Sequence, residues 1–115
     1  MKKILKYIIK SFLDFFINIM SKINYGRFIL DETNKSIINR KKIVVHKDIE
    51  LKFHIPNRLS HYRVDTFNSK EPETLEWIDS FKKRNIFWDI GANVGLYSCY
   101  AAKSVGSKVY AFEPS

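Results

Sequence analysis

The sequence predicts a parallel α/β unit, and three observations in its last thirty residues support this prediction. Ile86–Ile90 (IFWDI) is a short apolar run, residues 96–105 have helical character, and Lys108–Phe112 (KVYAF) is a second apolar run. A glycine-spaced turn at residues 91–95 joins the first run to the helix, and Gly106 ends the helix. Strand, turn, helix and strand in this order form one unit of a parallel sheet, with the turn at the carboxyl end of its first strand.

Length and composition indicate a folded chain. It has 115 residues, of which 45% are hydrophobic and 15% aromatic, and this composition favours a buried core over disorder. A parallel sheet is covered on both faces and needs more strands than these two. We therefore expect the sequence to be the front part of a larger domain, as a fragment or a truncated product. We expect this part alone to be unstable and inactive.

The net charge of +8 is unevenly distributed. Residues 1–42 hold ten basic and three acidic side chains, whereas residues 43–115 hold ten and nine. A basic arm can meet a membrane surface or nucleic acid, or it can be a solvated face. Because the arm has no recognisable nucleic-acid motif and the remainder is almost neutral, we expect no nucleic-acid partner.

Cysteine and histidine usage predicts neither a disulfide nor a metal site. Cys99 is the single cysteine, and its apolar neighbours predict a packed core thiol, which fits a cytoplasmic protein. His46, His54 and His61 lack the spacing and the neighbouring ligands of a metal centre. His54 falls on the polar side of its predicted strand, so we expect it at the surface.

Residues 1–23 predict an amphipathic helix. Polar residues recur every three or four positions along one face, and a wide apolar face of Ile, Leu and Phe occupies the rest. Lys10 and Asp14 would lie near the middle of a membrane span, where each costs about 2.5–3.5 kcal/mol. Lys6, Lys10 and Asp14 also interrupt the run that a cleaved signal peptide needs. Two interpretations remain: a helix peripheral to the membrane, lying in its interface, or a helix docked on the rest of the domain.

The middle of the chain divides into a connector, a hairpin, a polar loop and a helix. We expect residues 24–42 to be an irregular connector with a short strand near residues 27–30 and a solvated basic turn at its end. Period-two alternation over residues 43–55 predicts a β-hairpin with its turn at residues 47–48. Residues 57–68 read as a polar loop or short helix. A helix that covers the sheet near its first strand begins around residues 69–74, with residues 82–84 at its carboxyl end. The predicted division is therefore 1–42, 43–68 and 69–115.

The predicted polar loop at residues 57–68 contains four clustered polar side chains that could reach a substrate, although an ordinary polar loop is the simpler interpretation. These are Arg58, His61, Arg63 and Asp65.

The glycine turn has the features of a ligand site. Gly91 permits a sharp turn and close approach of a ligand, Gly95 permits close helix–strand packing, and Asn93 tolerates a left-handed backbone. The start of the following helix offers free amides to an anion such as a carboxylate. Asp89 can accept from a ligand's ammonium or from the turn's own amides, and Glu113, ending the next strand, suits two ribose hydroxyls.

Three ligand classes compete for this turn. A dinucleotide fingerprint requires glycines where Asn93 and Leu96 stand, and a Walker-type loop requires a Gly-Lys-Ser/Thr ending that is absent. An acid, spaced glycines and a second acid at the next strand's end favour S-adenosylmethionine.

The motif FWDIGANVGLYS at residues 87–98, followed by AFEPS at residues 111–115, closely resembles the opening of FkbM-type methyltransferases. The segment KEPETLEWI at residues 70–78 is also similar to the one that precedes this motif in such proteins. The resemblance covers about residues 58–115, and residues 1–57 have no recognised family motif.

This resemblance implies a Rossmann-like class I methyltransferase sheet that uses S-adenosyl-L-methionine to methylate a hydroxyl on a carbohydrate or other small acceptor. Gly91, Asn93 and Gly95 would line the methionine end of the cofactor, Asp89 would support its amino group, and Glu113 would hold the ribose. No residue can be assigned as the catalytic base. The alternative is a non-catalytic remnant or a basic membrane-surface module.

Overall fold

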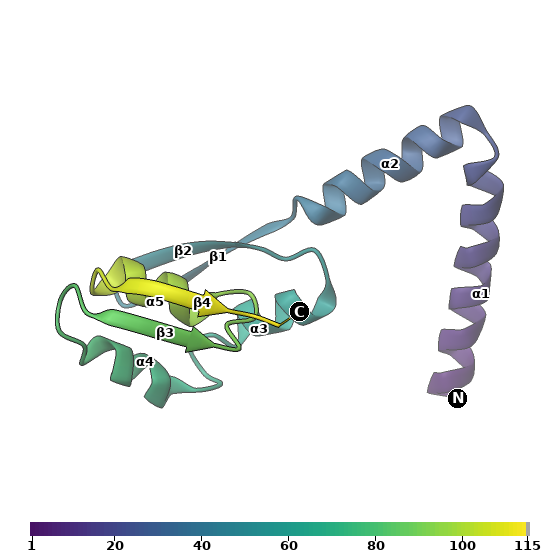
Figure 1. Cartoon of the computed structure of the whole chain (residues 1–115). Helices are drawn as coiled ribbons and strands as arrows, with labels where there is room; N and C mark the ends of the chain where they lie inside the picture. Colours follow the sequence, from purple (N-terminus) through teal and green to yellow (C-terminus); the bar gives the residue numbers. More distant parts are fainter. Residues whose placement is uncertain (115) are drawn as a thin grey trace. The chain divides into compact units, whose positions relative to one another are not determined.

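The computed structural model describes residues 1–114 and has a mixed α/β architecture (Figure 1). Within these residues it contains five helices and two separate two-stranded sheets, one antiparallel and one parallel. Contacts divide the chain into two compact units, Met1–Ile38 and Asn39–Ser115. The hairpin expected at residues 43–55 thus packs in the same unit as the strand–helix–strand segment.

The first unit consists of α1 (Lys2–Ser21) and α2 (Asn24–Ile38), which contact each other. Helix α1 confirms the helix that the apolar periodicity predicts at the amino end. It contains no buried residue, although half of its side chains are Ile, Leu or Phe. Among residues 1–114, no helix combines the length and apolar character required to cross a membrane.

The prediction of an irregular connector at residues 24–42 is wrong, because most of this segment is helix α2 and no strand forms near residues 27–30. Contacts between neighbouring turns favour the helix: the Lys35 ammonium lies 2.7 Å from Glu32 Oε1, and the Arg27 guanidinium donates to Asn24 Oδ1. Gly26 lets α2 start immediately after α1. A Cβ at this position would lie 2.3 Å from the carbonyl oxygen of Met20.

In the second unit, strands β1 (Lys41–His46) and β2 (Ile49–His54) form the predicted antiparallel hairpin. Lys41 pairs with His54 and His46 with Ile49, so the turn lies at residues 47–48 as expected. The hairpin begins two residues earlier than predicted, however. Lys41 and Lys42, which were expected in a basic turn, belong to β1 and pair with His54 and Phe53 at the end of β2. Leu51 and Phe53 point into the core, and His54 is exposed as predicted.

Two short helices follow the hairpin. The segment expected to be a polar loop or short helix contains α3 (Arg58–Asp65), where the Asn57 side chain caps the helix by accepting from the amide of Ser60 at 2.9 Å. Helix α4 (Pro72–Asp79) begins with its proline in the first turn, as predicted. It ends at Asp79, earlier than expected, so residues 82–84 lie outside the helix, and Arg84 has a left-handed backbone with φ +61°.

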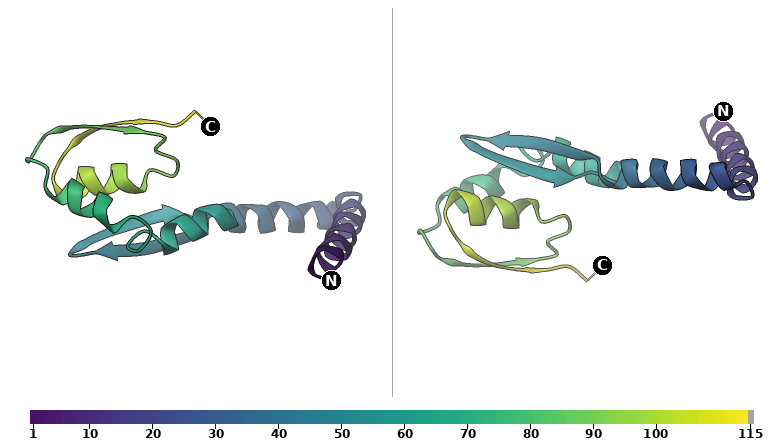
Figure 2. Two further views of the ribbon diagram at one scale, coloured as in Figure 1. Left: turned by 90° about the horizontal axis from the view of Figure 1, so that it is seen from below. Right: turned by 90° about the horizontal axis from the view of Figure 1, so that it is seen from above.

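The strand–helix–strand unit agrees with the sequence prediction. Strand β3 (Ile86–Ile90) pairs in parallel with β4 (Lys108–Phe112), and α5 (Leu96–Ser104) connects them. Helix α5 contacts both sheets and lies between the parallel pair and the hairpin (Figure 2). The core fills the space around α5 with residues from both sheets and three helices: Leu51, Phe53, Val64, Phe67, Leu75, Ile78, Phe87, Tyr100 and Ala101.

Helix α4 packs beside β3, as expected. Its buried residues are Leu75 and Ile78. Trp77 is largely exposed, but its ring lies 4.8 Å from that of Phe81 and 6.0 Å from that of Phe87 on β3. An aromatic cluster therefore joins α4 to the first parallel strand.

The other face of the parallel pair is bare in the described chain. Its exposed apolar side chains are Ile86, Trp88, Ile90, Tyr110 and Phe112. The rings of Trp88 and Phe112 lie 5.7 Å apart across the two strands. Parallel sheets are ordinarily covered on both faces, so this face has the composition of an interior surface.

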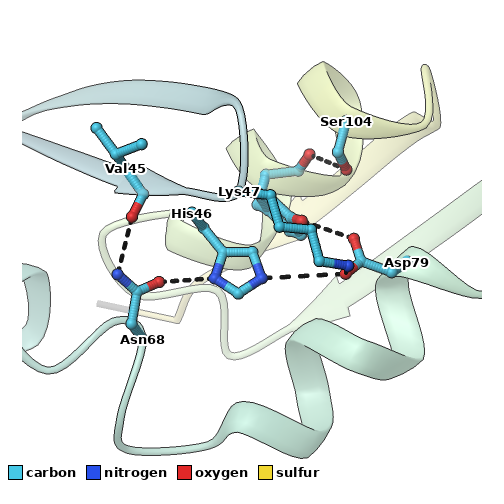
Figure 3. Close-up of polar contacts among 7 residues, drawn as sticks. Val45, His46, Lys47, Asn68, Asp79 and Ser104 are labelled. Carbon is cyan, nitrogen blue, oxygen red and sulfur yellow. Dashed lines mark hydrogen bonds and ion pairs between the residues drawn. The ribbon is translucent and has the colours of Figure 1, made fainter.

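A polar cluster joins the hairpin to α4 and α5 (Figure 3). Asp79, at the end of α4, accepts hydrogen bonds from Lys47 in the hairpin turn and, at 2.6 Å, from the hydroxyl of the buried Tyr100. His46 Nδ1 lies 2.8 Å from Asn68 Oδ1, and the Asn68 amide donates to the carbonyl of Val45 at 2.9 Å. Every one of these contacts joins residues distant in sequence, so the cluster fixes the hairpin on the helices.

Asp79 is ionised more readily than an ordinary aspartate. Partial burial alone would raise its pKa, but the hydrogen bonds from Lys47 and Tyr100 and the charge of Lys47 outweigh burial and lower the pKa. A lowered pKa in the folded state stabilises the fold above the ordinary aspartate pKa. That stabilisation is lost as the pH falls through the folded-state value.

We therefore predict that Asp79→Asn lowers the free energy of unfolding by about 1 kcal/mol at pH 7 and that this difference is smaller at about pH 3. Urea unfolding at both pH values measures it. Asp48→Asn is the matched control. Asp48 follows Lys47 in the hairpin turn, and its carboxylate has no partner among the described residues. Equal losses for the two variants would contradict the role of Asp79.

Candidate functional site

The glycine turn leaves β3 through three residues in the left-handed backbone region. Gly91 has φ +78°, Asn93 φ +51° and Gly95 φ +77°. Nothing lies within 4 Å of where a Cβ of Gly91 would be, so this position requires glycine for its backbone conformation alone. Asn93 is the non-glycine residue best suited to this region, as the sequence predicts.

The end of β4 holds the turn in place. The amides of Gly91 and Ala92 both donate to the carbonyl oxygen of Phe112, at 2.8 and 3.0 Å. The amide of Asn93 donates to the Glu113 carboxylate at 2.7 Å. The two acids of the predicted site thus end adjacent parallel strands, and Glu113 lies beside the turn.

The turn borders a pocket of about 170 Å³ between α3, α5 and the segment before α4. The pocket is lined by Arg63, Thr66, Phe67, Lys70, Glu71, Asp89, Gly91, Ala92, Asn93, Val94, Leu96 and Tyr97. Of the five predicted site residues, Asp89, Gly91 and Asn93 are therefore in its wall. Gly95 caps α5 next to it.

Glu113 lines a second, more open hollow of about 540 Å³, which also includes Gly91. Gly91 therefore lines both hollows. Glu113 uses Oε2 to accept from Asn93 and is exposed.

Two hydrogen bonds fix acidic side chains around the pocket. The Ser98 hydroxyl donates to Asp89 Oδ2 at 2.6 Å, and the Tyr97 hydroxyl donates to Glu71 Oε2 at 3.3 Å. Burial, together with the nearby negative charge of Glu71, raises the pKa of Tyr97 to about 12. Tyr97 therefore stays protonated near neutral pH and acts as a hydrogen-bond donor.

Sequence reasoning missed these supporting residues. Tyr97 and Ser98 lie at the start of α5, directly after the glycine turn. Their position in the sequence could therefore have identified them as residues near the site. Lys70 and Glu71 had no local signal, because only tertiary packing brings the segment before α4 to the pocket.

The four polar residues grouped in the predicted loop separate in the structure. Arg63 lines the pocket beside the glycine turn, and its Nε is buried with no hydrogen-bond partner among the described residues. Arg58, His61 and Asp65 instead line another hollow, together with Arg40 and Tyr62. There, His61 Nδ1 lies 2.8 Å from Asp65, which also pairs with Lys42.

The prediction of a packed thiol is wrong, because Cys99 is exposed. It lies on the side of α5 opposite its buried neighbours Ser98, Tyr100 and Ala101, a distinction that apolar composition does not reveal. Residual burial raises the pKa of the thiol, so the thiolate is not favoured.

The described residues contain no group of three or more His, Cys, Asp or Glu side chains arranged to hold a metal ion. His46 belongs to the polar cluster with Asn68 and Asp79, and His61 pairs with Asp65.

No protein-family model, curated protein or solved structure matches this chain.

We predict that Gly91→Ala destabilises the protein by about 1–2 kcal/mol, because alanine is strained in the left-handed region and no contact offsets the strain. Gly91→Asn should cost less, since asparagine adopts this conformation more readily. Urea unfolding of both variants measures the difference. Wild-type stability in the alanine variant would show that the turn does not need its positive φ.

Proposed function

We propose that this chain forms the cofactor-binding part of an S-adenosyl-L-methionine-dependent methyltransferase that acts on a hydroxyl of a carbohydrate or other small acceptor. The observation that carries the proposal is the pocket at the carboxyl end of β3. There, a glycine turn with two left-handed glycines follows Asp89, and Glu113 ends the adjacent parallel strand. Ligands of open parallel sheets bind at this end of the strands.

The signs of the charges in the pocket suit a zwitterion. Asp89 and Glu71 contribute carboxylates, whereas Arg63 and Lys70 contribute cations. The methionine end of the cofactor has one ammonium and one carboxylate, so both kinds of group are required. In this proposal Asp89, held by Ser98, accepts from the ammonium, and Arg63 donates to the carboxylate.

The unpartnered Nε of Arg63 supports this assignment most directly. A buried donor without an acceptor costs about 1–3 kcal/mol, so a small movement of the Arg63 side chain toward a carboxylate in the pocket would relieve this cost. Val94 and Leu96 also line the pocket, so the amino end of α5 borders the same space. An anion bound there would gain from the amino end of the helix.

The ribose would lie across Gly91, toward Glu113. This glycine lines both hollows, and it has no side chain. Glu113 keeps the Asn93 amide on Oε2 and offers Oε1 for ribose hydroxyls. The turn and the ribose would therefore share one carboxylate.

When bound, the cofactor would supply a methyl group on sulfur, which the acceptor oxygen displaces in line. The residues of this chain would position the cofactor, and such positioning lowers the barrier of a displacement between two bound groups. The bare face of the parallel pair also fits the proposal, since a methyltransferase sheet of this class covers that face with helices.

Binding of S-adenosylhomocysteine to the intact protein tests the proposal by isothermal titration calorimetry. We expect a measurable affinity for this ligand and none for NAD. The reverse result would refute the methyltransferase assignment.

For Glu113, we expect Glu113→Ala to weaken S-adenosylhomocysteine binding by about tenfold or more, because a hydrogen bond to a charged acceptor contributes about 1.5–3 kcal/mol. Glu113→Gln is the matched control for the turn, since its amide oxygen can still accept from Asn93 while the charge is lost. It should bind with intermediate affinity. Unchanged binding by the alanine variant would remove the ribose role of Glu113.

For Arg63, we expect Arg63→Gln to weaken S-adenosylhomocysteine binding by about tenfold or more, because a charge-assisted hydrogen bond to the carboxylate is lost. Binding of methylthioadenosine, which lacks the amino-acid group, should not change. Arg58→Gln removes the same charge from the neighbouring hollow and should leave both affinities as in the wild type. Equal losses for the two ligands would show that Arg63 supports the fold and does not bind the carboxylate.

A further inference from the structure

Helix α1 exposes an apolar face that runs from Ile4 to Ile19. Phe12 and Phe15 are 66% and 65% exposed, and the aliphatic side chains around them are about half exposed. The exposed apolar residues that form this face are Ile4, Leu5, Ile8, Ile9, Phe12, Phe15, Phe16 and Ile19. A water-exposed surface of this kind marks an interaction site.

The opposite face of α1 is polar and basic. Its residues recur every three or four positions and include Lys3, Lys6, Lys10, Asp14 and Asn18. All four lysines of the helix lie in its first half, and Asp14 is its only acid. The apolar face is therefore bordered by positive charge at its amino-terminal end.

The charge of the whole first unit has the same sign. Residues 1–38 hold seven lysines and arginines and three acids, a net charge of +4. An anionic lipid surface complements both features at once, since its acyl region accepts Phe and Ile and its phosphates attract lysine. A second copy packed in parallel would cover the apolar face but would bring its lysines beside those of the first copy.

We propose that α1 binds an anionic membrane surface, lying in the interface with its apolar face toward the acyl chains and its lysines toward lipid phosphates. This inference is independent of the proposed methyltransferase activity. It attaches the first unit to one leaflet and does not require a span, in agreement with the absence of a span-forming helix among residues 1–114.

Co-sedimentation of the intact protein with lipid vesicles tests this proposal. We expect binding to vesicles of equimolar phosphatidylglycerol and phosphatidylcholine, and much weaker binding to pure phosphatidylcholine. The combined change Lys3→Gln and Lys6→Gln should weaken binding to the anionic vesicles by about fivefold for each lysine. High salt should weaken it as well.

Two variants with the same charge change separate the apolar contact from the charge. Phe12→Asp places a carboxylate in the apolar face and should weaken binding by about tenfold or more. Asn18→Asp adds the same charge on the polar face and should retain most of the binding. Equal losses in the two variants would overturn the proposed orientation of α1.

Other occupants of the apolar face give different results. If a second copy covers it, sedimentation velocity will show self-association that Phe12→Asp abolishes, without binding to vesicles. If α1 instead docks on another part of the protein, Phe12→Asp will lower the thermal stability, again without binding to vesicles. Either result overturns the membrane proposal.

Discussion

The candidate site depends on one constraint, the hydrogen bonding of the glycine turn to the end of β4. Gly91 and Ala92 share the carbonyl of Phe112 as acceptor, and Asn93 binds the carboxylate of Glu113. These bonds are possible because β3 and β4 run parallel and end at the same edge. The left-handed residues of the turn then direct the chain into α5, which places Tyr97 and Ser98 beside the strand-end aspartate. Backbone pairing thus positions the side chains that could bind a ligand.

The packing of α5 explains why the hairpin belongs to the same unit. The helix has one sheet on each side, and Tyr100 at its centre is buried to 1% exposure. A buried tyrosine hydroxyl needs a partner, and Asp79 supplies it while also pairing with Lys47 of the hairpin turn. The polar cluster therefore satisfies a core donor and attaches the hairpin with the same carboxylate. Aromatic packing and polar contacts fix the same arrangement.

The two units differ in what their surfaces can do. The second unit concentrates opposite charges around a small pocket, an arrangement that suits a small polar ligand. The first unit exposes apolar and basic groups along a helix, an arrangement that suits an extended surface. If both proposals hold, the protein would bind its cofactor in one unit and a lipid surface through the other. Membrane attachment would then raise the local concentration of acceptors held at that surface.

Local signals in the sequence determined the amphipathic helix α1, the hairpin, the strand–helix–strand order and the positions of the glycine turn. These features depend on periodicity and on the backbone needs of glycine, proline and asparagine, and neighbouring residues suffice to specify them. Tertiary structure decided the rest. The helical state of residues 24–38, the exposure of Cys99 and the entry of Arg63, Lys70 and Glu71 into the pocket all depend on contacts or on the packing of whole elements. Sequence spacing alone does not show which face of a helix packs against a strand that is distant in the sequence, because packing of the whole core selects that face.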